Sequence, residues 1–254
     1  MELKNENTFS LHSDQYARYR PSYPDALFDF LLSLLSKKEK AWDCGTGNGQ
    51  MAVRLAPHFE QVFATDISGE QLKNAISHEK IQYSRQPAER TDFPPDFFDF
   101  VVVAQAIHWF DFDRFYGEVN RILRDEGIIA VVGYDRPQIS PEVDQVVTRF
   151  YRQTVGPYWD PERRYIDERY RTIPFPFHEM EAPAFSHELE WDFDHLTGYL
   201  RTWSAVKHYM RKVGEDPIGA ITGELKEAWG EKPAQIVKFP IILRVGRKRN
   251  RGVF

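Results

Sequence analysis

A loop with three alternate glycines, Gly45, Gly47 and Gly49, lies between a short apolar segment and an amphipathic one. Glycine tolerates positive φ and lets the backbone come close to a ligand, and the helix that follows offers unpaired N–H groups to electron-rich oxygens. A dinucleotide-binding fingerprint would need a glycine at position 50, where Gln50 stands. The pattern is instead an acidic residue, Asp43, followed by the three glycines, and it predicts a nucleotide-type binding loop.

A second carboxylate follows the next expected strand. The segment 61–66 is largely apolar and ends in Asp66. The carboxyl ends of neighbouring parallel strands meet at one edge of a sheet, so we expect Asp66 beside the glycine loop. A carboxylate there can accept two hydrogen bonds from a ribose diol. The two segments together predict a nucleoside site at this edge.

This combination resembles the class I S-adenosylmethionine-dependent methyltransferases, whose first motif is an acidic residue followed by alternate glycines and whose second strand ends in an acidic residue. Further segments resemble later parts of that family in the same order, at residues 87–94, 97–106 and 121–132. The last segment departs from the pattern, because Asp125 and Glu126 stand where Lys-Pro-Gly is more usual. The resemblance implies S-adenosylmethionine as the cofactor and S-adenosylhomocysteine as its product.

The resemblance also implies which residues hold the cofactor. Asp66 would bind the ribose hydroxyls, the glycine loop would face the methionine part, and the segment around Ala88 would flank the adenine. An N-terminal lid and Gln105, after the fourth strand, would complete the site. The residues so predicted to bind the cofactor are Tyr16, Arg20, Asp43, Gly45, Thr46, Gly47, Gly49, Asp66, Ile67, Ala88, Glu89 and Gln105.

Residues 16–24 and 104–110 resemble a subgroup of small-acid methyltransferases typified by trans-aconitate methyltransferase. By this resemblance His108 lines the acceptor side and is a candidate catalytic residue; a histidine that holds a loop by a backbone hydrogen bond is the alternative. Arg201 is the second catalytic candidate, because a guanidinium suits an anionic acceptor. A surface arginine on an amphipathic helix is the alternative there. Trp109 lies beside His108 and serves either the acceptor side or packing.

Tyr16, Tyr19 and Tyr23 recur at spacings of three and four residues, which places them on one helical face. Aromatic faces attract a sulfonium cation, so this stripe is expected at the site. An ordinary packed stripe has the same spacing.

The composition argues against nucleic acids and membranes as partners. The chain has 33 Lys and Arg against 38 Asp and Glu, a formal net charge of −5, and so lacks the global basic surface expected for tight nucleic-acid binding. The one cysteine, Cys44, cannot form an intrachain disulfide, and the apolar runs fall short of the roughly 20 residues of a membrane span. We expect a cytoplasmic protein with no metal site, no nucleic-acid partner and no membrane segment.

Strand-like and helix-like segments alternate through the first half of the chain. Such alternation predicts an α/β fold: a doubly wound, Rossmann-like sheet of seven strands, mostly parallel with an antiparallel C-terminal strand, and helices on both faces. We expect one domain over residues 1–254, with residues 1–24 as an N-terminal lid. Residues 136–183 are expected to form a cap over the acceptor pocket; a purely structural insertion is the alternative.

The predicted activity is methyl transfer from S-adenosylmethionine to a small-molecule acceptor at oxygen, a carboxylate being one version. The cofactor already carries the activated carbon, so the protein mainly positions the acceptor and excludes water. A carboxylate acceptor needs no base, whereas a hydroxyl, an amine or a carbon acid needs help to lose its proton. The alternatives are a carbon methyltransferase acting on a quinone or related aromatic, and a regulator that binds the cofactor without catalysis. We expect a monomer or a homodimer.

Overall fold

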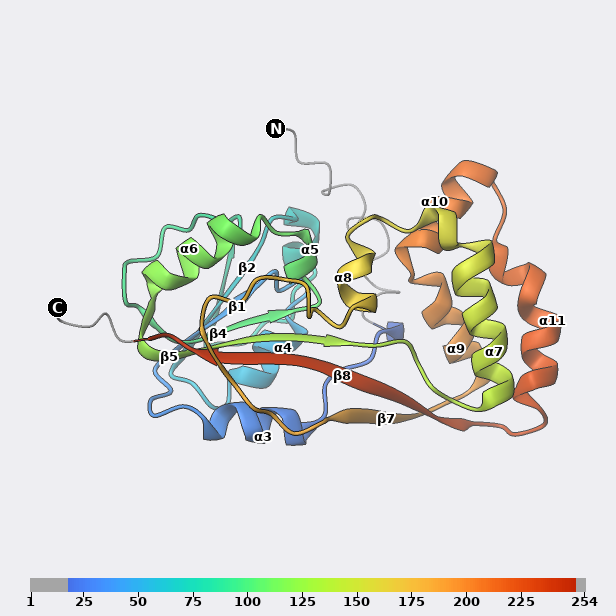
Figure 1. Cartoon of the computed structure of the whole chain (residues 1–254), viewed down its shortest axis with the longest axis horizontal. Coiled ribbons are helices and arrows are strands. Elements are labelled where there is room, and N and C mark those ends of the chain that lie inside the picture. The colour runs from blue at the N-terminus through green and yellow to red at the C-terminus, as the bar shows by residue number, and fades with distance from the viewer. Residues whose placement is uncertain (1–17, 250–254) are drawn as a thin grey trace.

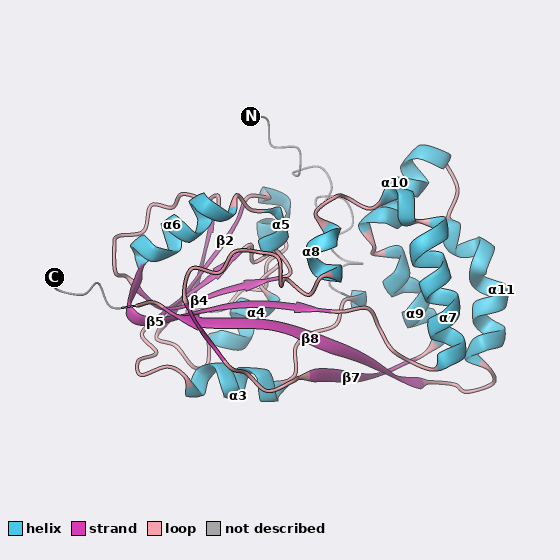
Figure 2. Ribbon diagram, in the orientation of Figure 1, coloured by secondary structure: helices cyan, strands magenta, loops and turns pink. Residues whose placement is uncertain are grey.

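The computed structural model describes residues 18–249, which form a twisted sheet flanked by helices, with a further group of helices at one end (Figure 1, Figure 2). The first half alternates strands and helices: α3 (Asp25–Ser33), β1 (Lys40–Cys44), α4 (Gln50–Leu55), β2 (Gln61–Asp66), α5 (Gly69–Lys73), β3 (Ile81–Arg85), β4 (Phe98–Ala104), η1 (Ile107–Trp109), α6 (Phe112–Ile122) and β5 (Leu123–Tyr134). The second half contains α7 (Pro141–Arg149), η2 (Phe150–Thr154), η3 (Gly156–Tyr158), α8 (Arg163–Asp167), β6 (His178–Met180), β7 (Ser186–Trp191), α9 (Phe193–Arg201), α10 (Ser204–Val213), α11 (Pro217–Trp229) and β8 (Gln235–Arg247).

Several helices begin at a residue whose side chain caps them. The carboxylate of Asp111 accepts the N–H of Arg114 at the start of α6, and the hydroxyl of Ser140 accepts the N–H of Val143 at the start of α7. Pro141 occupies the first turn of α7, where no N–H is needed. These caps fix the ends of the connections between the sheet and its covering helices.

The strands run in the order β3-β2-β1-β4-β5-β8-β6, and β7 pairs with β8 off this path. Strands β1 to β5 pair in parallel, whereas β8 is antiparallel to β5, β6 and β7. The doubly wound, mostly parallel sheet with an antiparallel C-terminal strand is confirmed. The sheet has eight strands where seven were expected, because β8 is long enough to pair with β7 through its first half and with β5 and β6 through its second.

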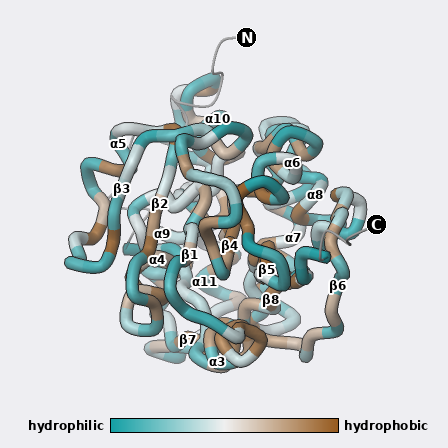
Figure 3. Tube along the Cα trace, turned by 90° about the vertical axis from the view of Figure 1, so that its left-hand side faces the viewer, coloured by the Kyte–Doolittle hydropathy of each residue, from teal (hydrophilic) through white to brown (hydrophobic). Residues whose placement is uncertain are grey.

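The central strands are apolar on both faces because helices cover both. On β4, Phe100 and Val102 face a core shared with α3 and α4, whereas Val101 and Val103 face a core shared with α6. Hydrophobic stretches accordingly mark β4 and β5, while the edge strand β3 is largely hydrophilic (Figure 3). The strand order reverses between β1 and β4, which in such sheets is where ligands bind, outside the carboxyl ends.

Helices α7, α9, α10 and α11 gather at the end of the molecule remote from α6 (Figure 1). Their buried residues, such as Val146, Leu196 and Leu225, belong to the same cluster as Leu27 of α3. The expected cap, residues 136–183, therefore supplies α7 with η2 and η3 to this group, and α9, α10 and α11 come from the segment between β7 and β8. Of the expected lid, residues 1–17 lie outside the described residues.

Candidate active site

The glycine loop after β1 is tied to the end of β2. The N–H groups of Gly45 and Thr46 both donate to the carbonyl of Thr65, each at 2.9 Å. Gly45 has φ of +69°, and a Cβ added there would lie 2.6 Å from the Cβ of Ala106. Only glycine therefore lets this loop pass so close to the segment that follows β4.

Asp43 is a fully buried carboxylate beneath this loop. Its Oδ2 accepts the hydroxyl of Thr46 at 2.5 Å, and its Oδ1 has no hydrogen-bond partner among the described residues. Burial raises the pKa of Asp43 to about 7, and the Thr46 hydrogen bond opposes that rise in part. The loop thus contains a buried acid with one oxygen left over.

Asp66, at the end of β2, connects the glycine loop after β1 with the loop that follows β2. Its Oδ2 accepts the N–H of Gly47 and its Oδ1 accepts the N–H of Ser68, both at 2.8 Å. Burial raises the pKa of Asp66, while the two backbone donors act in the opposite direction. Each oxygen keeps a second lone pair, so the carboxylate can accept further hydrogen bonds from a ligand.

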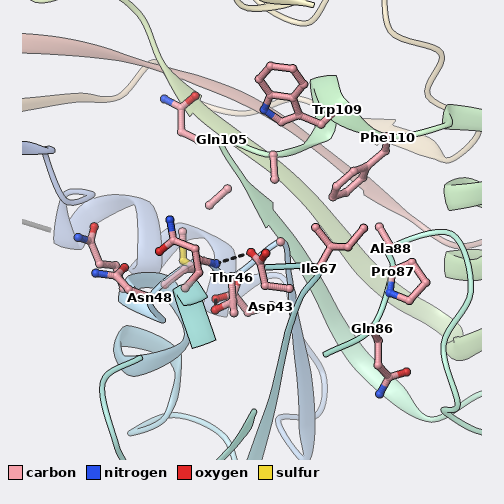
Figure 4. Close-up of a pocket in the computed structure, with 18 of the residues that line it drawn as sticks. Asp43, Thr46, Asn48, Ile67, Gln86, Pro87, Ala88, Gln105, Trp109 and Phe110 are labelled. Carbon is pink, nitrogen blue, oxygen red and sulfur yellow. Dashed lines mark hydrogen bonds between the residues drawn. The ribbon is translucent and has the colours of Figure 1, made fainter. Parts of the chain in front are cut away.

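The segment after β4 forms the opposite side. Gln105 has φ of +55°, a strained conformation for a residue other than glycine. Its N–H donates to Val132 at 2.9 Å, and its amide Nε2 donates to the carbonyl of Tyr134 at 3.4 Å. Gln105 and Trp109 lie across from Thr46 and Asp43 (Figure 4).

Arg20 and three aromatic side chains complete this side. The guanidinium of Arg20 donates to the hydroxyl of Tyr134 at 3.0 Å and to the carbonyl of Thr202 at 3.2 Å. The rings of Tyr23 and Tyr134 are 6.2 Å apart between centroids. We call Tyr23, Trp109 and Tyr134 the aromatic wall, and residues 43–48, 66–67 and 86–89 the loop wall.

The two walls enclose a cavity of about 740 Å³. Most of the residues predicted to bind a cofactor line it: Arg20, Asp43, Gly45, Thr46, Gly47, Asp66, Ile67, Ala88, Glu89 and Gln105. Further lining residues were not predicted from the sequence, among them Asn48, Gln50, Met51, Gln71 and Gln86. The one signal in the sequence that could have pointed to the cavity was closeness to the glycine motif, which applies to Asn48, Gln50 and Met51.

Gly49 is not among the lining residues, although it was predicted to bind the cofactor. It precedes α4 with φ of +86°, and an added Cβ would collide with the Tyr83 hydroxyl, which donates to the carbonyl of Ile76 at 2.8 Å. The glycine is therefore needed for the start of the helix and for packing. Tyr16 lies outside the described residues.

His108 does not line the cavity either. Its side chain points into the core, where Nδ1 lies 3.4 Å from the hydroxyl of Tyr170, and the residue is only 6% exposed. Burial, and next the positive charge of Arg163, lower the pKa of His108 to about 3, so the ring is neutral at ordinary pH. This environment agrees with a histidine that holds a loop, although its partner is a side chain instead of the backbone.

Arg201 lies at the end of α9 with its side chain 42% exposed. Its Nε donates to Asp216 at 2.8 Å, next to the start of α11. Arg201 is absent from the cavity lining, so its geometry agrees with the surface-arginine alternative.

Comparison with known proteins gives consistent results. A sequence model for the methyltransferase domain matches residues 42–131, the stretch that contains the loop wall. A protein of Dictyostelium discoideum named as a methyltransferase is 31% identical over 253 residues, 96% of each chain. A Mycobacterium tuberculosis protein named as an uncharacterized methyltransferase is 30% identical over 187 residues, 73% of this chain and 68% of that one.

A solved structure is also similar over nearly the whole chain. It is described as a type II methyltransferase from Anaeromyxobacter dehalogenans, is 43% identical, and superposes with a TM-score of 0.84 over 90% of this chain and 98% of that one. The sequence matches, the doubly wound sheet and a pocket at the carboxyl ends of its strands agree with one another. The chain belongs to the class I S-adenosylmethionine-dependent methyltransferases.

Proposed function

We propose that this methyltransferase binds S-adenosylmethionine against the loop wall and transfers the methyl group to oxygen of a small-molecule acceptor that lies against the aromatic wall. The observation that carries the proposal is Asp66, which holds the Gly47 N–H while lining the cavity. This arrangement couples a carboxylate suited to a ribose diol with a loop that a bulky side chain would obstruct.

The chemistry of the loop wall fits the cofactor. The free Oδ1 of Asp43 offers negative charge inside the protein, where a cationic ligand would offset the cost of ionising it. At Gly45 a Cβ would be too close to Ala106, so the loop can take this path beside the cavity only with glycine there. Asp66 would hold the ribose, and residues 86–89 would flank the adenine.

The residues of this chain would contribute by positioning the reactants and by excluding water. S-adenosylmethionine, when bound, supplies a methyl carbon activated by a positively charged sulfur. Gln105, fixed by its bonds to Val132 and Tyr134, would hold the end of β4 against the ligand. Trp109 and Phe110, which also line the cavity, would exclude water from the reacting atoms.

The N-terminal segment and the insertion would close the acceptor side. Arg20, Pro21 and Tyr23 of the proposed lid line the cavity, and Glu162 does so from the proposed cap, residues 136–183. Within residues 18–249 no helix combines the length and the apolar character that crossing a membrane requires. A cytoplasmic location, the absence of a nucleic-acid partner, and a monomer or homodimer stay predictions.

Two measurements test the proposal. The purified chain should bind S-adenosylhomocysteine in a calorimetric titration, and with S-adenosylmethionine and a panel of hydroxyl compounds and carboxylic acids it should release S-adenosylhomocysteine. Absence of binding would contradict the cofactor assignment. Binding with methylation at carbon of a quinone would replace the oxygen assignment, and binding without turnover across a broad panel would favour the regulator.

A further inference from the structure

One residue of the proposed cap reaches the cavity, and it is charged. Of the described residues after position 135, Glu162 alone belongs to the lining. All other lining residues lie between residues 20 and 134. Whatever the second half of the chain adds directly to this pocket is therefore a carboxylate.

Packing fixes the segment that carries Glu162. This residue immediately precedes α8, which lies between the sheet and the helical group (Figure 1). The ring of Tyr165 packs edge-on against Phe112 of α6 at 5.2 Å, and Ile166 is buried in the core beside that helix. The turn before α8 is thereby held at the pocket.

The basic neighbours of Glu162 direct their hydrogen bonds to other groups, although, after the hydrogen bond to Tyr165, the negative charge of Glu162 contributes to the raised pKa of Arg164. Arg163 donates to the hydroxyl of Tyr151 at 2.9 Å and stacks on Trp159 at 4.7 Å, and Arg164 donates to Tyr165 at 2.9 Å. Within residues 18–249 no hydrogen bond or ion pair to the Glu162 side chain is formed. A half-buried acid in a ligand cavity is left with its acceptor capacity free.

Resting on the proposed function, we infer that the acceptor is an aromatic compound with a hydroxyl group, and that Glu162 accepts the proton of that hydroxyl. The residues of the aromatic wall line the cavity, and aromatic side chains pack favourably against another ring. As the O–H bond breaks, the proton passes to a carboxylate oxygen of Glu162. The hydroxyl oxygen's electron pair forms the new bond to the methyl carbon and displaces the neutral thioether; Glu162 then releases its proton to water.

A carboxylic acid acceptor fits this pocket less well. It needs no base, and its charge would be repelled by Glu162 inside a cavity of reduced polarity. Arg20, the one basic residue among the described residues that line the cavity, donates to Tyr134 and to Thr202, whereas the same lining contains five acidic residues. The pocket therefore favours an acceptor that donates a hydrogen bond to Glu162.

A matched pair of probes, 2-naphthol and 2-naphthoate, tests the inference with the full chain saturated with S-adenosylhomocysteine. In calorimetric titrations the wild type should bind 2-naphthol at least about tenfold tighter than 2-naphthoate, because charge repulsion acts only on the second compound. Glu162→Gln should reduce that ratio by about fivefold or more through tighter naphthoate binding. Glu181→Gln, an exposed glutamate of the same insertion, should keep the wild-type ratio.

Turnover provides the second readout. With S-adenosylmethionine and 2-naphthol, Glu162→Gln should lower kcat by about 100-fold or more while the affinity for S-adenosylhomocysteine stays unchanged. Glu162→Asp keeps the charge and should retain the preference against naphthoate. Thermal unfolding of each variant checks that it is folded.

The outcomes separate the two proposals. A wild type that does not bind S-adenosylhomocysteine overturns the proposed function itself. A wild type that binds S-adenosylhomocysteine but prefers 2-naphthoate, or binds neither probe, shows that the aromatic hydroxyl acceptor is wrong. The same conclusion follows if Glu162→Gln keeps both the wild-type preference and the wild-type kcat. In these cases methyl transfer itself stands.

Discussion

The loop wall is built from short stretches at the carboxyl ends of strands, whereas the aromatic wall takes one side chain from each of three segments far apart in the chain. In the loop wall the decisive contacts are backbone N–H groups on Asp66 and on Thr65. In the aromatic wall they are side-chain contacts, such as the bond between Arg20 and Tyr134 across 114 positions of sequence. The difference predicts that changes to the first wall affect cofactor binding most, and that changes to the second are smaller and act on stability or acceptor choice.

The largest effect should come from the glycine loop. Gly45→Ala forces a side chain into positive φ and toward Ala106, so we expect affinity for S-adenosylhomocysteine to fall by more than about 100-fold in calorimetry. Gly214→Ala is the matched control, because its φ is also positive, an added Cβ would meet nothing within 4 Å, and it lies at the end of α10 outside the cavity lining. Equal losses in the two variants would show that the approach to Ala106 does not matter.

Asp43 should make stability depend on pH within the loop wall. Its folded-state pKa, about 7, lies above its ordinary value of 3.8, so its stabilising protonation is lost as pH rises through 7. Between pH 5.5 and 7.5 the wild type should lose about 2 kcal/mol more unfolding free energy than Asp43→Asn. Urea denaturation at the two pH values measures this difference. An equal change of unfolding free energy with pH in the two proteins would contradict the buried acid.

His108 should make the unfolding free energy depend on pH in the opposite direction to Asp43. Its pKa of about 3 lies below the ordinary value of 6.5, so the stability of the neutral ring is present above pH 6.5 and is lost as pH falls toward 3. Between pH 7 and 5 the wild type should lose about 2 kcal/mol more than His108→Phe in urea denaturation. A histidine that instead titrates near 6.5 would give the same loss in both proteins and would reopen its catalytic role.

The smallest effect should come from the aromatic wall. Tyr134→Phe removes the hydroxyl that accepts from Arg20 but leaves the Arg20 bond to Thr202, so unfolding free energy should fall by about 1 kcal/mol. Affinity for S-adenosylhomocysteine should change far less than in Gly45→Ala. A loss of cofactor affinity as large as that of Gly45→Ala would remove the distinction between the walls.

The loop wall could be predicted because its residues lie in contiguous motifs at strand ends, and parallel pairing brings those ends together. Ten residues predicted to bind the cofactor line the cavity for this reason. Gly49 shows where prediction from a motif fails. A side chain there would collide with Tyr83 of β3, so the glycine is required by packing and not by the cavity.

Tyr23 and Trp109 of the aromatic wall were expected near the site, from the tyrosine spacing and from the resemblance, and both line the cavity, whereas the cap contact could not be predicted. Nothing in the sequence around Glu162 distinguishes it from other acids, and its place depends on how α8 packs against α6. The environments of His108 and Arg201 likewise depend on Tyr170 and Asp216, which lie on other elements. Resemblance could suggest a role for these residues, but burial and ion pairing decide where their side chains lie.

The central claim is that Asp66 and the glycine loop together bind the adenosyl cofactor, and calorimetry with S-adenosylhomocysteine tests it most directly. Asp66→Ala should bind more weakly than the wild type by about 1.5–3 kcal/mol, the usual contribution of hydrogen bonds to a charged group. Asp113→Ala, an exposed acid on α6, should bind as the wild type does. Unchanged affinity in Asp66→Ala, or no binding by the wild type, would contradict the account.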